Sequence, residues 1–151
     1  MYEHWDANAI VFIATTVAVG AVVMMHYEGL NLLSRTLAHR RTSHRRRKVL
    51  YGIFGVLALH LVEMWIFGLT MAALLLMPDT GHISGADRLG LLDSVYLAAT
   101  TYTTLGFGDL TPVGPIRFLV GMIALTGFVL VAWSASFTYL EMSRDWREGA
   151  S

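Results

Sequence analysis

Cysteine is missing from this chain of 151 residues, which excludes structural disulfides and thiolate metal sites. The missing cysteine also leaves the redox compartment unspecified. No excess of either charge exists, because eleven Lys and Arg balance eleven Asp and Glu. No internal repeat is visible, and we find no nucleotide-binding, cofactor-binding or catalytic constellation. We therefore expect neither an enzyme nor a cofactor-dependent protein, and no nucleic acid as a partner.

Apolar residues are what the chain has in abundance. They make up 55% of the sequence, and the mean hydropathy is +0.55, which indicates an integral membrane protein. Crossing a bilayer takes about 20 residues, and three runs are long enough: residues 9–25, 49–77 and 116–140. A fourth run, residues 91–104, is too short to cross and has the length of a re-entrant helix.

Residues 101–109, between the second and third spans, read T-Y-T-T-L-G-F-G-D. A dehydrated cation needs a cage of oxygens, which an extended chain can supply from its carbonyls. Gly106 and Gly108 permit the backbone angles that such a chain requires. Leu105 and Phe107 alternate with them and are expected to pack outward against the preceding helix. The alternative is a tight buried turn, but lipid tolerates irregular backbone only where it lines a cavity.

This stretch, with D-S-V-Y-L-A-A-T at residues 93–100 and L-T-P at 110–112, resembles the one-pore-loop potassium channels. The resemblance spans roughly residues 49–143 and implies a pore module of two transmembrane helices and a re-entrant pore helix, assembled as a homotetramer. With the first apolar run added, we expect an all-α membrane protein with three transmembrane helices. The remaining parts are a first helix with a basic loop, residues 1–48, and a short tail, residues 144–151. Potassium is the permeant ligand in this resemblance, held by five filter residues: Thr104, Leu105, Gly106, Phe107 and Gly108.

The resemblance also assigns the filter supports Asp109, Tyr96 and Leu97. Many relatives have tyrosine at the position of Phe107, held by a tryptophan of the pore helix. Phenylalanine lacks the tyrosine hydroxyl and therefore lacks hydrogen bonds that are each worth about 0.5–1.5 kcal/mol net. Tyr96 could still reach Asp109. The expected function is selective passive potassium conduction. The alternatives are a weakly selective cation channel and a non-conducting sensor or accessory subunit.

Basic residues gather between the first two spans. Residues 26–48 hold seven of the eleven Lys and Arg against the single acid Glu28, so this loop should be cytoplasmic. The N-terminus is then outside, the C-terminus inside and Asp109 at the outer mouth, in what we expect to be a bacterial inner membrane. The acidic leader of the first run argues against a cleaved signal peptide.

The same loop is either a topology signal alone or an interfacial helix that touches anionic lipid through Leu30, Leu33 and Leu37. Its arginines lack the spacing of a voltage sensor. The tail after Leu140 is too short for a ligand-binding domain.

His60 and Glu63 lie three residues apart near the middle of the second span. Ionisable groups there should face protein, either each other or Thr15 and Thr16 of the first span. The pair is either a structural hydrogen-bonded pair or a proton-sensitive switch. Two ligands alone give a metal site poor support.

Inner helices of the family often carry a glycine hinge, and Gly127 is the first candidate for it, with Gly121 the second. The alternative is that Gly127 is a small residue that allows close packing of helices. Asp93 or Ser94 is the expected N-cap of the pore helix. Four residues at helical spacing would line the inner cavity: Val129, Ala132, Ser136 and Leu140.

Overall fold

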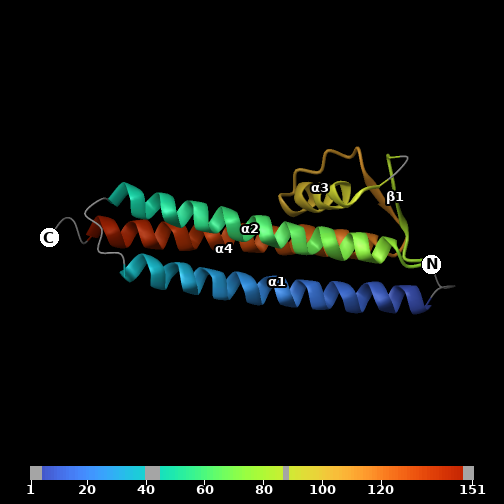
Figure 1. Cartoon of the computed structure of the whole chain (residues 1–151), viewed down its shortest axis with the longest axis horizontal. Coiled ribbons are helices and arrows are strands. Elements are labelled where there is room, and N and C mark those ends of the chain that lie inside the picture. Colours follow the sequence, from blue (N-terminus) through green and yellow to red (C-terminus); the bar gives the residue numbers. More distant parts are fainter. Residues whose placement is uncertain (1–4, 40–44, 87–88, 148–151) are drawn as a thin grey trace.

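The fold is an antiparallel arrangement of long helices with a short helix and a strand pair at one end (Figure 1). The computed structural model describes residues 5–39, 45–86 and 89–147. The expected leader up to residue 4, the arginines Arg40 and Arg41 and the end of the tail lie outside the described residues. The elements, in chain order, are α1 (Trp5–His39), α2 (Arg45–Leu75), β1 (His82–Ser84), α3 (Leu91–Tyr102), β2 (Thr111–Val113) and α4 (Arg117–Arg147).

Helices α1, α2 and α4 confirm the three expected spans. Each contains a stretch long and apolar enough to cross a membrane: Trp5–Ala38, Arg47–Leu75 and Arg117–Arg144. Most large apolar side chains on these stretches are exposed in the single chain, so lipid or neighbouring chains must cover them. The mainly helical membrane fold is therefore confirmed.

Helix α1 is much longer than the apolar run that predicted it. It continues from Met25 to His39 through sequence that we expected to be a basic loop. Polar residues end an apolar run without ending a helix, because backbone hydrogen bonding does not depend on side-chain polarity. Leu30 and Leu37 are buried in this extension. An added Cβ on Gly55 or Gly52 of α2 would contact Leu33 or Leu37, so the expected amphipathic piece packs against α2.

Helix α3 begins at Leu91 as expected, but its N-cap is Gly90. The prediction of Asp93 or Ser94 as N-cap is wrong. Asp93 sits one turn into the helix and accepts a hydrogen bond from the Gly90 amide at 2.7 Å. The Ser94 amide donates to the Gly90 carbonyl at 3.3 Å. A carboxylate in the first turn also interacts favourably with the helix dipole.

A two-stranded antiparallel sheet joins the segments on either side of α3, a feature that the sequence did not predict. Strand β1 pairs with β2 in a register that sets Ile83 opposite Pro112. The hydroxyls of Ser84 and Thr111 hydrogen-bond across the pair at 2.6 Å. The sheet therefore ties the entry to α3 to the chain that leaves the loop after it.

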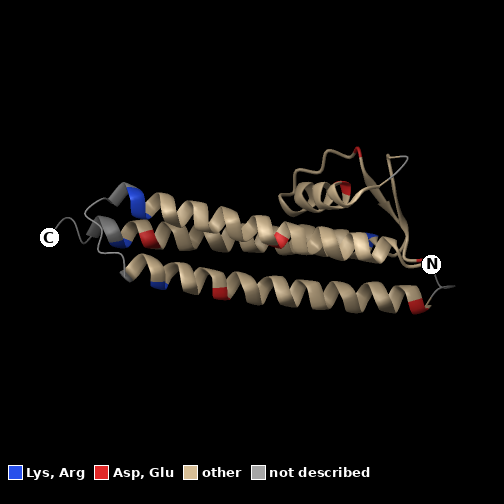
Figure 2. Ribbon diagram, viewed as in Figure 1, with Lys and Arg blue, Asp and Glu red and all other residues tan. Residues whose placement is uncertain are grey.

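The core lies where α2, α3 and α4 meet. Phe67 and Met71 of α2, Ala98 and Tyr102 of α3 and Ile123 of α4 are fully buried there. Figure 2 shows most of the coloured Lys and Arg positions at the end of the bundle opposite α3. Glu63 is the one acidic residue in the sequence of α2.

Candidate functional site

The loop after α3 has an alternating backbone. Thr104, Gly106 and Gly108 have φ of 58°, 53° and 80°, whereas Leu105 and Phe107 between them keep negative φ. A threonine rarely adopts positive φ, because its β-branched side chain makes that region unfavourable. The surrounding structure must therefore hold Thr104 in this conformation.

Hydrogen bonds from the end of α3 anchor the inner half of the loop. The amides of Leu105 and Gly106 both donate to the Thr100 carbonyl, at 2.9 and 3.1 Å, and the Thr104 amide donates to Thr101 at 2.9 Å. The loop thus folds back on the last turn of α3, whose free carbonyls it satisfies.

A single side-chain bond holds the outer half. The Tyr96 hydroxyl donates to Asp109 Oδ2 at 2.9 Å, and this bond raises the pKa of Tyr96 above its ordinary value of 10.0. The structure therefore brings together two of the three expected supports. The third, Leu97, is buried in the core on another side of α3 and helps to fix that helix.

The outward packing of Leu105 and Phe107 is largely missing within one chain. Their side chains are 60% and 66% exposed, so their own pore helix covers only a minor part of each. All the loop residues from Thr103 to Asp109 are exposed. Within one chain the loop is therefore irregular, strained at Thr104 and uncovered.

Gly127 lies where α4 crosses the end of α3. A Cβ built on it would overlap the backbone carbonyl of Tyr102, whereas one built on Gly121 would meet nothing within 4 Å. The structure therefore gives Gly127 a close-packing role. The four expected cavity-lining residues lie on α4 and are all exposed in the single chain: Val129, Ala132, Ser136 and Leu140.

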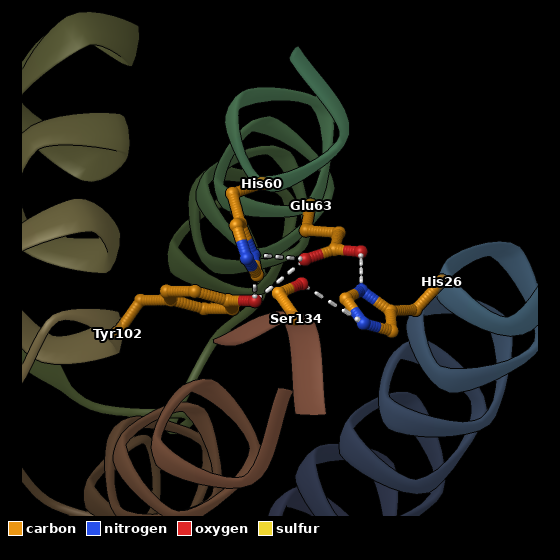
Figure 3. Close-up of polar contacts among 5 residues, drawn as sticks. All are labelled: His26, His60, Glu63, Tyr102 and Ser134. Atoms are coloured by element: carbon orange, nitrogen blue, oxygen red, sulfur yellow. Dashed lines mark hydrogen bonds and ion pairs between the residues drawn. The ribbon is translucent and has the colours of Figure 1, made fainter. Parts of the chain in front are cut away.

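His60 and Glu63 meet in a larger buried cluster (Figure 3). His60 Nδ1 lies 2.9 Å from Glu63 Oε2 and 2.8 Å from the hydroxyl of Tyr102, the last residue of α3. That hydroxyl donates to Glu63 Oε2 at 2.5 Å. The cluster thus connects the middle of α2 to the residue that leads into the loop.

Helix α1 supplies the next member. His26 Nδ1 lies 2.7 Å from Glu63 Oε1, and His26 Nε2 lies 3.4 Å from Ser134 Oγ on α4. The expectation that Thr15 or Thr16 would fill this role is wrong. Thr16 donates instead to the carbonyl of Phe12, and the hydroxyl of Thr15 is buried without a hydrogen-bond partner.

The sequence analysis missed His26, Tyr102 and Ser134. His26 fell just beyond the apolar run and was assigned to the basic loop, although a histidine with Tyr27 and Gly29 can continue a membrane helix. Tyr102 was read only as part of the filter motif. A signal for His26 was present, since Glu63 at membrane depth requires ionisable or polar partners from another helix.

Comparison with known proteins agrees with this architecture. The family described as Ion channel matches residues 49–142. The chain is 45% identical over 47 residues to Protein LctB of Bacillus caldotenax, which covers 30% of this chain and 35% of that protein. It is 30% identical over 87 residues to Protein LctB of Geobacillus stearothermophilus, which covers 52% of this chain and 65% of that protein.

Neither alignment reaches two thirds of the relative's own length. No solved structure matches the chain. The family match extends from the start of α2 to near the end of α4, and thus includes the loop, α3 and both helices that flank them. Since it covers more than half of the 151 residues, the chain belongs to the ion channel family.

Proposed function

We propose that this protein conducts potassium passively and selectively across a membrane, through a pore formed by a homotetramer. The observation that carries the proposal is the alternating sign of φ along residues 104–108 of the T-x-x-T-x-G-F-G-D loop. Such alternation allows successive carbonyls of an extended chain to face one side, as a filter for dehydrated cations requires. Thr104, Leu105, Gly106, Phe107 and Gly108 would hold the ions.

A ring of identical chains accounts for the exposure of the loop. One loop can supply only one wall of a cage, and cyclic symmetry closes the ring with the same surface repeated. Leu105 and Phe107, exposed in one chain, would then be covered by the neighbouring chain, and the exposed face of α4 would line the inner cavity.

The orientation is part of the proposal. Most of the described Lys and Arg positions lie at the end of the bundle opposite α3 (Figure 2), the end that the positive-inside rule assigns to the cytoplasm. The loop would then open to the outside at Asp109, in a bacterial inner membrane. Anionic lipid at the basic end is a further partner that this charge distribution favours.

A weakly selective cation channel is the second candidate. Phe107 has no hydroxyl, so the Tyr96–Asp109 hydrogen bond supports the outer half of each loop without help from that side chain. A loosely held filter discriminates less well between ions of different size. The remaining alternative, a non-conducting sensor or accessory subunit, predicts no ion flux at all.

Ion flux from liposomes separates these three functions. We expect purified protein to release potassium down a gradient, with little sodium flux under the mirrored gradient. Equal flux of both ions would establish the weakly selective channel. Absence of any flux above empty liposomes would exclude conduction.

Mass measurement in detergent tests the assembly separately. We expect a tetramer with the loop on its axis and α1 at the periphery. A stable monomer or dimer as the main species would contradict the proposed pore.

A further inference from the structure

The buried cluster brings together three side chains that commonly ligate metals. One ring nitrogen each of His26 and His60 and a carboxylate oxygen of Glu63 all lie within 4.8 Å of one another. The exposed fractions of the three residues are 0%, 8% and 0%. We propose that these residues, with the hydroxyl of Tyr102, form a binding site for a divalent transition-metal cation of the zinc class.

The donor set fits that class of cation. Two imidazole nitrogens and one carboxylate are a ligand set that zinc uses in proteins, with a further position open to an oxygen. Imidazole ligands favour zinc and its transition-metal neighbours over the alkaline-earth cations. Tyr102 supplies an oxygen as the fourth ligand, because its hydroxyl lies 2.8 Å from His60 Nδ1 and 2.5 Å from Glu63 Oε2.

The distances require only a small expansion. The donor atoms now lie at hydrogen-bond separation, 2.7 Å for His26 to Glu63 and 2.9 Å for His60 to Glu63. Ligands around a tetrahedral zinc with bonds of about 2.0–2.2 Å lie about 3.3–3.6 Å apart. Side-chain rotations that displace each donor atom by less than about 1 Å would make room for the cation.

Ser134 has the position of an outer-shell partner. A neutral imidazole that donates from Nδ1 must move this proton to Nε2 before Nδ1 can bind a cation, with no net loss of protons. His26 Nε2 lies 3.4 Å from Ser134 Oγ, which can accept the hydrogen bond from the relocated proton. Metal-binding histidines are usually held by such a partner on the other ring nitrogen.

The electrostatics also favour a cation. Glu63 is a carboxylate in the apolar middle of α2, where a charge without compensation is costly. Its two oxygens are met by imidazoles and a phenol rather than by Lys or Arg. A bound cation would offset its charge and fix α1, α2 and the end of α3 to one another.

Cobalt titration of the purified full chain tests this site. Protein without a polyhistidine tag, treated with a chelator and dialysed, is titrated with Co²⁺ while visible absorption is recorded. We expect a tetrahedral cobalt spectrum that saturates at one equivalent per chain and is displaced by Zn²⁺. His26→Gln and His60→Gln should lose the spectrum. His82→Gln, on the exposed strand β1, should keep it.

Two further variants separate ligation from structure. His26→Cys should keep cobalt binding and add a thiolate-to-cobalt charge-transfer band in the near ultraviolet. Ser134→Ala should weaken binding by about 10–100-fold, the usual effect of removing an outer-shell partner. Wild-type protein without a cobalt spectrum, or a spectrum unchanged in His26→Gln, would overturn the proposal. The readout does not involve ion flux, so its result is independent of the proposed conduction.

Discussion

The loop after α3 and the buried cluster adjoin at Tyr102 and are built in opposite ways. The loop from Thr103 to Asp109 is exposed and irregular, and it would act through its backbone. The cluster is buried, acts through side chains and has its hydrogen bonds made within a single chain. The cluster is therefore assembled within one chain, whereas the side chains of the loop remain uncovered there.

The two regions also respond differently to substitution. A change in the loop should alter ion selectivity while the fold of the single chain persists, because few intrachain contacts depend on the loop. A change in the cluster should alter stability first, because four helices meet there.

The largest effect is expected from Gly106→Ala. No atom lies within 4 Å of an added Cβ, so the cost comes from the φ of 53° alone, on the order of 1 kcal/mol or more per subunit. We expect potassium-selective flux from liposomes to be lost. The matched control is Gly121→Ala on α4, where an added Cβ also meets nothing and which should conduct normally. Potassium selectivity that is unaltered in the Gly106→Ala variant would contradict the proposal that this loop is the filter.

Glu63→Ala should cause the largest loss of stability. It leaves His26, His60 and Tyr102 without their common acceptor in a buried site, and a buried polar group left without its partner costs about 1–3 kcal/mol. Thermal unfolding in detergent measures this loss. Glu28→Ala, on an exposed position of α1, is the control and should change stability by less than about 0.5 kcal/mol. Equal stability of the two variants would show that the cluster contributes little.

Gly127→Ala should have an intermediate effect. The added Cβ would overlap backbone atoms of Tyr102, so α4 must move away from α3, at about 1–3 kcal/mol. Gly121→Ala in the same helix should instead stabilise by about 0.5–1 kcal/mol, since alanine is the better helix former. Unfolding curves that rank these two variants in the reverse order would exclude the packing role of Gly127.

Tyr96→Phe should have the smallest effect. It removes the hydroxyl bond to Asp109 at the exposed outer half of the loop. We expect a modest fall in the potassium-to-sodium permeability ratio with little change in folding. Because the pKa of Tyr96 is raised above its ordinary value of 10.0, the phenol stays protonated at every pH up to 10.0. The hydrogen bond to Asp109 is lost only when the pH rises through this raised pKa. The difference from wild type should therefore be constant across neutral pH, and a difference that varies there would implicate another group.

Local features were predictable from the sequence. The apolar runs predicted α2 and α4, and the short run predicted α3, because apolar length reports directly on the membrane. The motif indicated where the backbone would be unusual, since alternating glycines permit positive φ at every second residue. The length of α1 was not predictable from hydropathy, because a helix can continue where its apolar surface ends.

Contacts between distant segments were not predictable. The pairing of β1 with β2 brings together residues almost thirty positions apart, in segments of three residues each that carry little strand signal. His26 and Ser134 approach Glu63 only through the packing of three long helices, and apolar periodicity does not reveal which polar residue faces which. The position of Glu63 at membrane depth indicates that polar partners exist, but it does not identify them.

The order of the cluster residues along the chain has a consequence for biogenesis. Synthesis proceeds from the N-terminus, so His26 is already present when Glu63 enters the membrane, and His60 accompanies it. Tyr102 and Ser134 follow only with the later segments. Helix α1 can therefore provide a hydrogen-bond partner for the one acidic side chain of α2 before α3 and α4 have been synthesised.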